Sequence, residues 1–322
     1  VLGLGLFMFI SYWRIGFVPS FIKAAGIGSM VSSIGKDLLN LWACMRGDVD
    51  NCIFFTMFEE PTIINKTESV QIDMKAYNLV IDENGDFDVT VELDVYNNVL
   101  DFVQIKPYCI LEYNKLKQEI QPTQLEAFSQ GNTFVFEKSS SEQTTAFHCQ
   151  GHISDLPEIG VAKLTVVLQR PVLVSSYMQI RTMQHAKERV QEKSFMEQAA
   201  PYLFWISIPS SQPFDVGQYT MRLVLKQSDY DAKLKSIEWI RAVVQSNDIA
   251  LYCDDFKQIK QNEVELTNIE DISKYLVSKK NVETYSFNCK LDVLAASEKE
   301  QKALVKATTL YVVESKKKFT LK

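Results

Sequence analysis

The sequence contains six cysteines, and their number and setting indicate what chemistry they perform: Cys44, Cys52, Cys109, Cys149, Cys253 and Cys289. Each of the last four follows an aromatic residue by one or two positions, which is typical of a cysteine on a buried strand. An even number of such cysteines favours disulfides and an oxidising compartment. We expect sequence neighbours to pair, Cys44 with Cys52, Cys109 with Cys149, and Cys253 with Cys289. The alternative is six reduced cysteines in the core of a cytosolic protein.

Two histidines close to one cysteine are the strongest candidate for a metal site. His148, Cys149 and His152 could together ligate zinc, but no second close cluster supplies the remaining ligand. The sequence contains one further histidine, His185. We therefore expect no metal and no cofactor.

An alternating acidic run, Asp82-Glu83-Asn84-Gly85-Asp86-Phe87-Asp88, offers oxygen ligands of the kind that calcium prefers. However, Gly85 takes the fourth place of this run, whereas an EF-hand loop needs glycine at its sixth place. Asn84-Gly85 is also a strong hairpin-turn signal. We predict a plain hairpin here, with calcium as the alternative.

Two short motifs concern the cell exterior. Arg46-Gly47-Asp48, between Cys44 and Cys52, looks like a cell-adhesion tripeptide, although chance places it in some chains of this length. Asn65-Lys66-Thr67 is a sequon for N-glycosylation. We expect Asn65 to be exposed and to be the glycosylation site if the protein is secreted.

Signatures of catalysis are missing from the sequence. No glycine-rich phosphate loop follows a strand and no Gly-x-Ser-x-Gly motif occurs. The carboxylate pairs Glu59-Glu60 and Asp254-Asp255 fit solvated loops, and a net charge of −6 disfavours nucleic acid as a partner. We therefore predict that the protein is not an enzyme; a hydrolase that uses carboxylates is the weaker alternative.

Two stretches of the sequence resemble each other. Residues 85–93 and 217–225 both read Gly-x-aromatic-x-apolar-x-apolar-x-Leu, the period-2 alternation of a half-buried strand. Each is followed by an aromatic–Cys strand, a polar connection, a second Cys strand and a closing β-rich stretch. This order predicts two β-sandwich domains of immunoglobulin-like outline, each fastened by one disulfide. Neither copy has the tryptophan that antibody domains place between their cysteines.

The predicted fold is mainly β: an N-terminal apolar helix, then two tandem Ig-like β-sandwich domains with a helical linker between them. We place the domains at 59–177 and 201–322. The linker at 178–200 is rich in Gln, Ala, Met and Glu and lacks Gly and Pro, which favours a helix.

Residues 1–58 form the predicted helical anchor or assembly segment. Arg14 and Lys23 interrupt its apolar run and would be costly at a bilayer centre. Small residues spaced by four line one helix face and suit packing against another helix: Ala24, Gly28 and Ser32. A membrane anchor, a filament core and a buried helix all remain open for this segment.

This layout resembles that of type IV pilins and archaeal flagellins, which place a β-rich globular part after a long apolar helix. The chain has Gly5 where bacterial pilins carry a glutamate. The resemblance implies self-association through the N-terminal helices. We expect a non-enzymatic extracellular or cell-surface protein with a structural or adhesive role, whose partners are other copies, the membrane or other surface proteins. The alternative is a receptor ectodomain that binds a ligand or glycan.

Overall fold

The structure of the chain is a computed structural model that describes residues 60–68, 70–113, 116–125, 127–153, 162–267, 269, 271–278 and 282–322. These residues belong to one compact unit, Glu59–Lys322. The predicted N-terminal helix, with Ala24, Gly28 and Ser32, the Cys44–Cys52 pair and the Arg46-Gly47-Asp48 motif lie outside the described residues. Among the residues that are described, none belongs to a helix long and apolar enough to cross a membrane.

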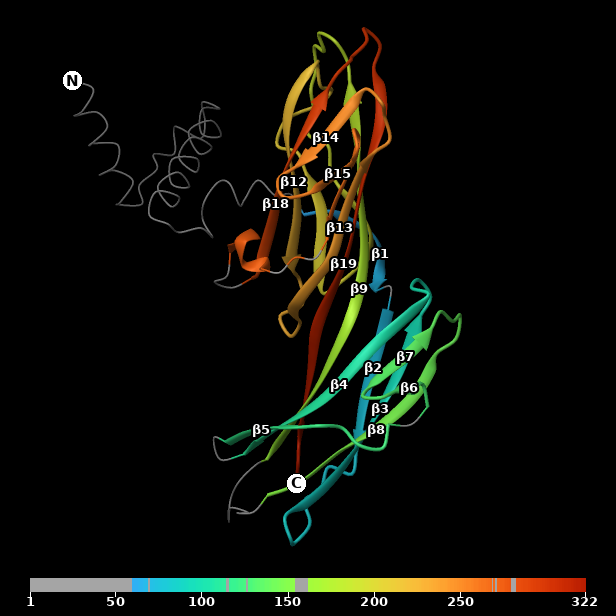
Figure 1. Cartoon of the computed structure of the whole chain (residues 1–322), viewed down its shortest axis with the longest axis vertical. Helices are drawn as coiled ribbons and strands as arrows, with labels where there is room; N and C mark the ends of the chain where they lie inside the picture. The colour runs from blue at the N-terminus through green and yellow to red at the C-terminus, as the bar shows by residue number, and fades with distance from the viewer. Residues whose placement is uncertain are drawn as a thin grey trace, which may run out of the picture. The chain divides into compact units, whose positions relative to one another are not determined.

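Strands dominate the described part of the chain and assemble into three sheets (Figure 1). The three-stranded sheet has the order β2 (Val70–Tyr77), β3 (Asp86–Asn97), β8 (Gln143–His152). The five-stranded sheet has the order β11 (Tyr202–Ser207), β12 (Gly217–Gln227), β18 (Thr284–Val293), β14 (Ile249–Cys253), with β17 (Leu276–Ser278) also on β18. The short 3₁₀ helix η2 (Ile272–Tyr275) precedes β17.

The third and largest sheet contains eleven strands. Its main path is β15 (Lys257–Lys260), β16 (Glu263–Thr267), β13 (Lys233–Val244), β19 (Gln301–Thr320), β9 (Lys163–Thr182), β4 (Phe102–Tyr113), β7 (Thr133–Glu137), β6 (Ser129–Gln130). Three further strands join it at the side: β5 (Leu116–Ile120) on β4, β10 (Phe195–Ala199) on β9, and β1 (Thr62–Glu68) on β10.

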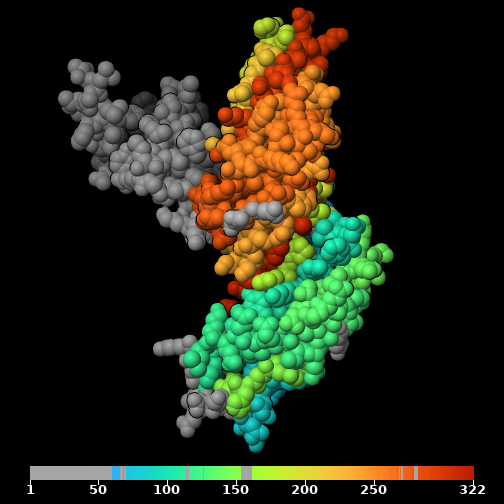
Figure 2. Space-filling view, in the orientation of Figure 1, coloured from blue at the N-terminus to red at the C-terminus, as the bar shows by residue number. Residues whose placement is uncertain are grey.

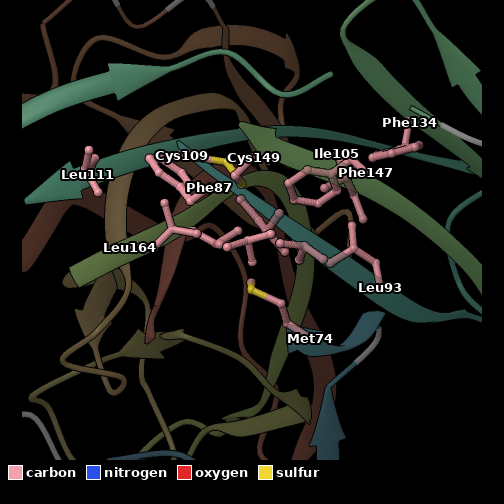
Figure 3. Packing of buried hydrophobic residues seen from close by; sticks show 14 of the residues in the cluster. Met74, Phe87, Leu93, Ile105, Cys109, Leu111, Phe134, Phe147, Cys149 and Leu164 are labelled. Carbon is pink, nitrogen blue, oxygen red and sulfur yellow. A yellow bond between two sulfur atoms is a disulfide. The ribbon is translucent and has the colours of Figure 1, made fainter. Parts of the chain in front are cut away.

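The first lobe is a two-layered β-sandwich. Its layers are the β2–β3–β8 sheet and the part of the large sheet that contains β4, β7 and the first residues of β9. Strand β3 alternates as predicted, with Phe87, Val89 and Leu93 among the side chains that it buries in the core. In Figure 3, Phe87 and Leu93 of this strand lie in one cluster with Cys109, Ile105 and Leu164 of the opposite layer. The disulfide between Cys109 on β4 and Cys149 on β8 joins the two layers, as predicted.

The second lobe packs the five-stranded sheet on β13, β19 and the second half of β9. Trp205 and Tyr202 of β11 are fully buried in it, and the backbone N–H of Tyr202 donates to the hydroxyl of Tyr311 on β19. Cys253 and Cys289 form the predicted disulfide, but they lie directly opposite each other on β14 and β18. This disulfide therefore joins neighbouring strands of one sheet. The expectation that it fastens two layers is wrong.

Strands β9 and β19 are each 20 residues long and run through both lobes. Their antiparallel register is continuous from Gln301 paired with Thr182 to Thr320 paired with Lys163. Figure 1 shows β19 and β9 passing from one lobe into the other, and Figure 2 shows the two lobes filled in, coloured by residue number. The predicted boundaries at 59–177 and 201–322 do not separate these strands, because β9 crosses residue 177 and the end of β19 returns to the first lobe. Whether the two lobes unfold together or separately is a question for calorimetry.

The predicted helical linker, residues 178–200, is wrong. Residues 178–182 complete β9, where Met178, Ile180 and Thr182 are buried at alternating positions. Residues 195–199 form β10, which pairs with β9 and β1. Pairing of residues 178–182 with β19, and of residues 195–199 with β1 and β9, outweighs the helix propensity of these residues, since local propensity is weak beside tertiary packing.

Candidate interaction site on the β2–β3–β8 sheet

The outer surface of the three-stranded sheet carries a group of polar side chains that bond to one another. Because side chains alternate along a strand, the residues between the buried ones face solvent. We call this set the polar face: Lys75, Tyr77, Asp86, Asp88, Thr90, Glu92, Asp94, His148, Gln150 and His152. It includes two of the three histidines of the sequence.

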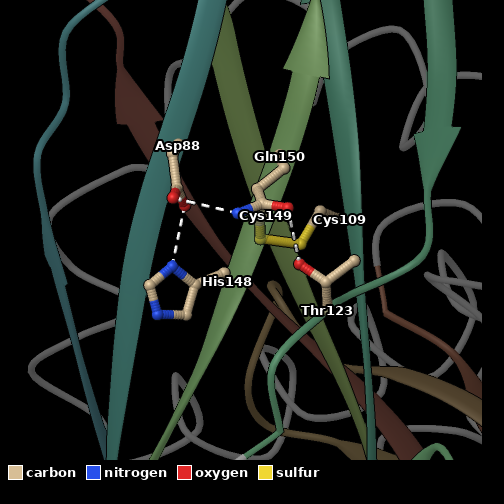
Figure 4. Close-up of a disulfide and its surroundings, with 6 residues drawn as sticks. All are labelled: Asp88, Cys109, Thr123, His148, Cys149 and Gln150. Atoms are coloured by element: carbon tan, nitrogen blue, oxygen red, sulfur yellow. Dashed lines mark hydrogen bonds and ion pairs between the residues drawn. A yellow bond between two sulfur atoms is a disulfide. The ribbon is translucent and has the colours of Figure 1, made fainter.

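Asp88 is the centre of a chain of hydrogen bonds (Figure 4). Its Oδ1 lies 2.8 Å from Nδ1 of His148, and its Oδ2 accepts from Nε2 of Gln150 at 2.9 Å. Gln150 in turn accepts from the hydroxyl of Thr123 at 3.0 Å. Partial burial alone would raise the pKa of Asp88, but the hydrogen bonds from Gln150 and His148 outweigh it and lower that pKa. Asp88 is therefore held as an oriented carboxylate at neutral pH.

The disulfide lies directly beneath this chain of hydrogen bonds. Cys149 sits between His148 and Gln150 on β8, but it points inward to Cys109, and both cysteines are fully buried. Thr123 is held against β8 by two backbone hydrogen bonds with His148, both 2.9 Å long. The backbone under the polar side chains is thus tied on both sides. Because Cys149 is in a disulfide, its sulfur is not a free thiolate for a metal.

The predicted hairpin at 82–86 is present and ends the polar face. One carboxylate oxygen of Asp82 accepts the backbone N–H groups of Asn84 and Asp86, each at 2.9 Å. Gly85 has a φ of +90°, which favours glycine, and a side chain there would meet the carbonyl oxygen of Ile153 at 2.3 Å. The next outward residue, Asp86, lies 2.8 Å from Nδ1 of His152. Asp82, Asp86 and Asp88 thus have separate partners.

A shallow, open depression of about 450 Å³ lies between this hairpin and β8. Its polar lining residues are Asp82, Asp86, Asp88 and Gln150, and Val80 and Phe87 add apolar lining. Phe87 lies over Gly151, where any Cβ would come within 2.6 Å of the ring. Oriented carboxylates and an amide beside apolar surface can bind a polar ligand.

The other end of the polar face is a charged cluster around Asp94. Lys75 donates to Asp94 at 2.5 Å and lies 3.5 Å from Glu92, and Thr144 donates to Asp94 at 2.7 Å. The hydrogen bonds from Lys75 and Thr144 lower the pKa of Asp94. Within the described residues, no group of three or more His, Cys, Asp or Glu side chains is arranged to hold a metal ion.

The sequence singled out some of these residues for other reasons. His148 and His152 were considered as metal ligands, and both instead bind aspartates of β3. Gln150 and Thr123 were missed, although the alternation His148-x-Gln150-x-His152 is a visible signal of one polar strand face. Asn65 lies exposed on β1, as we expected.

Over its described residues the chain is a disulfide-bonded β-sandwich protein with a polar outer sheet face. No family model matches the sequence, and no curated protein matches it.

Several solved structures are similar in part. A conserved protein of unknown function from Pseudomonas aeruginosa PAO1 has 9% identity and a TM-score of 0.17, over 75% of this chain and 97% of its own. Alpha-2-macroglobulin of E. coli in its native conformation has 10% identity and a TM-score of 0.16, over 74% of this chain and 14% of its own. The collagen binding domain of the surface protein RspB from Erysipelothrix rhusiopathiae has 9% identity and a TM-score of 0.13, over 80% of this chain and 87% of its own. TM-scores this low carry no argument about fold or function.

Proposed function

We propose that the chain is a non-enzymatic structural and adhesive protein of the cell exterior, in which two lobes act as one stiff unit that presents the polar face to partners. The observation that carries this proposal is the uninterrupted pairing of β9 with β19 through both lobes. Two lobes that share a hydrogen-bonded ladder bend less readily than two domains joined by a loop.

A buried arginine reinforces the connection between the lobes. Arg170 of β9 is 7% exposed, and its guanidinium donates to the carbonyl of Val70 at 3.0 Å and to the carboxylate of Glu68 at 2.6 Å. These contacts tie β9 to the point where the chain passes from β1 into β2. A charge-assisted contact of this kind is stronger than a neutral hydrogen bond.

A buried glutamate joins strands of both lobes. Glu314 of β19 is 3% exposed and accepts the hydroxyl of Tyr108, from β4 in the first lobe, at 2.6 Å. It also pairs with Lys235, from β13 in the second lobe, at 2.9 Å, and accepts from Gln169 at 3.0 Å. Burial alone would raise its pKa, but hydrogen bonds from Tyr108, Lys235 and Gln169 outweigh it and lower the pKa of Glu314 to about 2. The carboxylate therefore stays charged and bonded at neutral pH.

Two disulfides among the described residues are compatible with an extracellular location, because such bonds persist in oxidising compartments. Attachment through residues 1–58, by a membrane anchor or by pilin-like assembly, remains part of the proposal.

Stiffness is tested by measuring the distance between spin labels on the two lobes. Labels introduced as non-cysteine side chains at Leu116 and Tyr230, which are 69% and 76% exposed, should give one narrow distance distribution. Two glycines inserted after Val172 in β9 should broaden it, whereas the same insertion after Ser210 should not. A broad distribution in the unaltered chain would refute the stiff unit.

Location is tested on intact cells that make the chain. A membrane-impermeant amine reagent should label surface lysines such as Lys117 and Lys257 without lysis, and a cytosolic protein should stay unlabelled. Labelling that requires lysis would contradict a surface role.

A second candidate, a receptor ectodomain for a ligand or glycan, is favoured by the depression beside Asp86, Asp88 and Gln150. A glycan array tests it. Asp88→Asn and Gln150→Ala should then abolish a binding signal that Gln71→Ala, on the same sheet but distant from the depression, retains.

A further inference from the structure

Strand β1 carries the one N-glycosylation sequon of the sequence, Asn65-Lys66-Thr67. Asn65 is exposed, as are Thr62 and Ile64 before it. Because the middle residue is not proline, the motif meets the requirement for the transfer of a glycan. The disulfides Cys109–Cys149 and Cys253–Cys289 are compatible with passage through an oxidising compartment such as the ER lumen, where such transfer takes place.

β1 also lies at an edge of the large sheet. It pairs in parallel with β10, with Thr62 opposite Phe195 and Ile63 opposite Met196, and no other described strand pairs with it. Ile64 is an apolar residue on this strand and is 58% exposed. An unpaired edge with exposed apolar residues invites pairing with another chain, and natural proteins usually cover or charge such edges.

Strand β2, which follows β1 along the chain, shows another way of protecting an edge. Arg170 donates to the carbonyl of Val70 and Lys317 donates to the carbonyl of Met74. These two cationic side chains occupy carbonyl groups of β2 that an incoming strand would need.

We propose that Asn65 carries an N-linked glycan and that this glycan covers the edge of β1 that no described strand pairs with. In the transfer, the side-chain amide nitrogen of Asn65 bonds to the anomeric carbon of a lipid-linked oligosaccharyl diphosphate. The bond between that carbon and the diphosphate breaks, the lipid diphosphate leaves with the electron pair, and the amide loses one proton to a base of the transferase. No oxidation or reduction takes place.

The site is tested on the full chain secreted from glycosylating eukaryotic cells. Peptide-N-glycosidase digestion in heavy-oxygen water should convert Asn65 to a labelled aspartate, detected by peptide mass spectrometry. Asn65→Gln and Thr67→Ala should each lose the mobility shift of the glycan, and Thr67→Ser, which keeps the sequon, should retain it. An unmodified Asn65 peptide from secreted protein with both disulfides formed overturns the proposal.

The covering role is tested on folded protein, so that it does not depend on a variant that must fold without its glycan. Enzymatic removal of the glycan should raise the fraction of dimers and larger species in light scattering by about two-fold or more, as an uncovered edge would. Ile64→Lys, which places a charge on the same edge, should keep the deglycosylated protein monomeric. Unchanged association after deglycosylation overturns the covering role, even if Asn65 is glycosylated.

Discussion

Gly85 shows how one backbone position shapes the end of the polar face. Its left-handed conformation turns the chain between Asp82 and Asp86, and its missing side chain lets the carbonyl of Ile153 approach. Gly85→Ala should therefore destabilise the protein by about 2–4 kcal/mol, from strain and from steric overlap. Gly131→Ala is the matched control, because Gly131 also has positive φ but no atom within 4 Å of a Cβ. It should cost about 1–2 kcal/mol. Equal losses in urea unfolding would contradict this explanation.

Glu314 predicts a defined dependence of stability on pH. Its pKa in the folded state, about 2, lies below the ordinary value of 4.5, so its contribution is present above the unfolded pKa and is lost as the pH falls towards 2. Glu314→Gln should therefore be less stable than the parent by about 3 kcal/mol at neutral pH. This gap should shrink between about pH 5 and pH 2. Glu197→Gln, at an exposed pair with Lys306, should show no such change. Denaturant titrations across this pH range decide the matter.

Sequence reasoning at the residue scale succeeded where the signal was local. The Asn84-Gly85 turn and the cysteine pairs 109–149 and 253–289 depend on composition and nearby spacing. The contacts of His148 and Asp88 could not be predicted. They depend on the register between β3 and β8, and strands β4 to β7 lie between these two along the chain.

At the scale of elements, the two disulfides differ in surroundings. Cys109 and Cys149 are fully buried between two sheets, whereas Cys253 is only partly buried, at the end of β14. Because exchange requires a thiolate to reach a sulfur, Cys253–Cys289 should be reduced at a lower concentration of dithiothreitol than Cys109–Cys149. Alkylation followed by peptide mass spectrometry measures the order. In denatured protein the difference should vanish, and earlier reduction of Cys109–Cys149 in folded protein would refute the prediction.

The predicted linker helix shows why elements can be misassigned. Composition between 178 and 200 favours a helix, yet the burial of Met178, Ile180 and Thr182 has the period of a strand. The same strand contains Pro171, which lies between Gln169, where pairing with β4 ends, and Ser176, where pairing with β10 begins. Proline is tolerated in strands at positions that need not donate to a ladder. Neither feature can be interpreted without knowing which strands flank β9.

At the scale of the molecule, the shared strands predict one cooperative unfolding transition for residues 60–322. Leu93 is fully buried in the first lobe and Leu223 in the second. Leu93→Ala and Leu223→Ala should each cost about 2–5 kcal/mol and move the same calorimetric transition. Two transitions, each moved by only one of the substitutions, would show that the lobes unfold separately.

The pairing of β9 with β19 could not be predicted from the sequence, because a local sequence pattern does not indicate which distant strand will be its neighbour. The two alternating stretches correctly indicated β-sandwich-like layers. They suggested two self-contained domains, because nothing in the sequence of β19 indicates that its end belongs to the first lobe.

That return sets an order for biosynthesis. Phe319 packs on the core of the first lobe and Leu321 is part of it, and the backbone of Lys322 bonds to Leu79 and Ile81. A ribosome adds about 5–20 residues per second, so the strands made early wait on the order of ten seconds or more for the one that completes their layer. During that interval their apolar sides are open to chaperones, and residues 319–322, made much later, complete the packing of the first lobe.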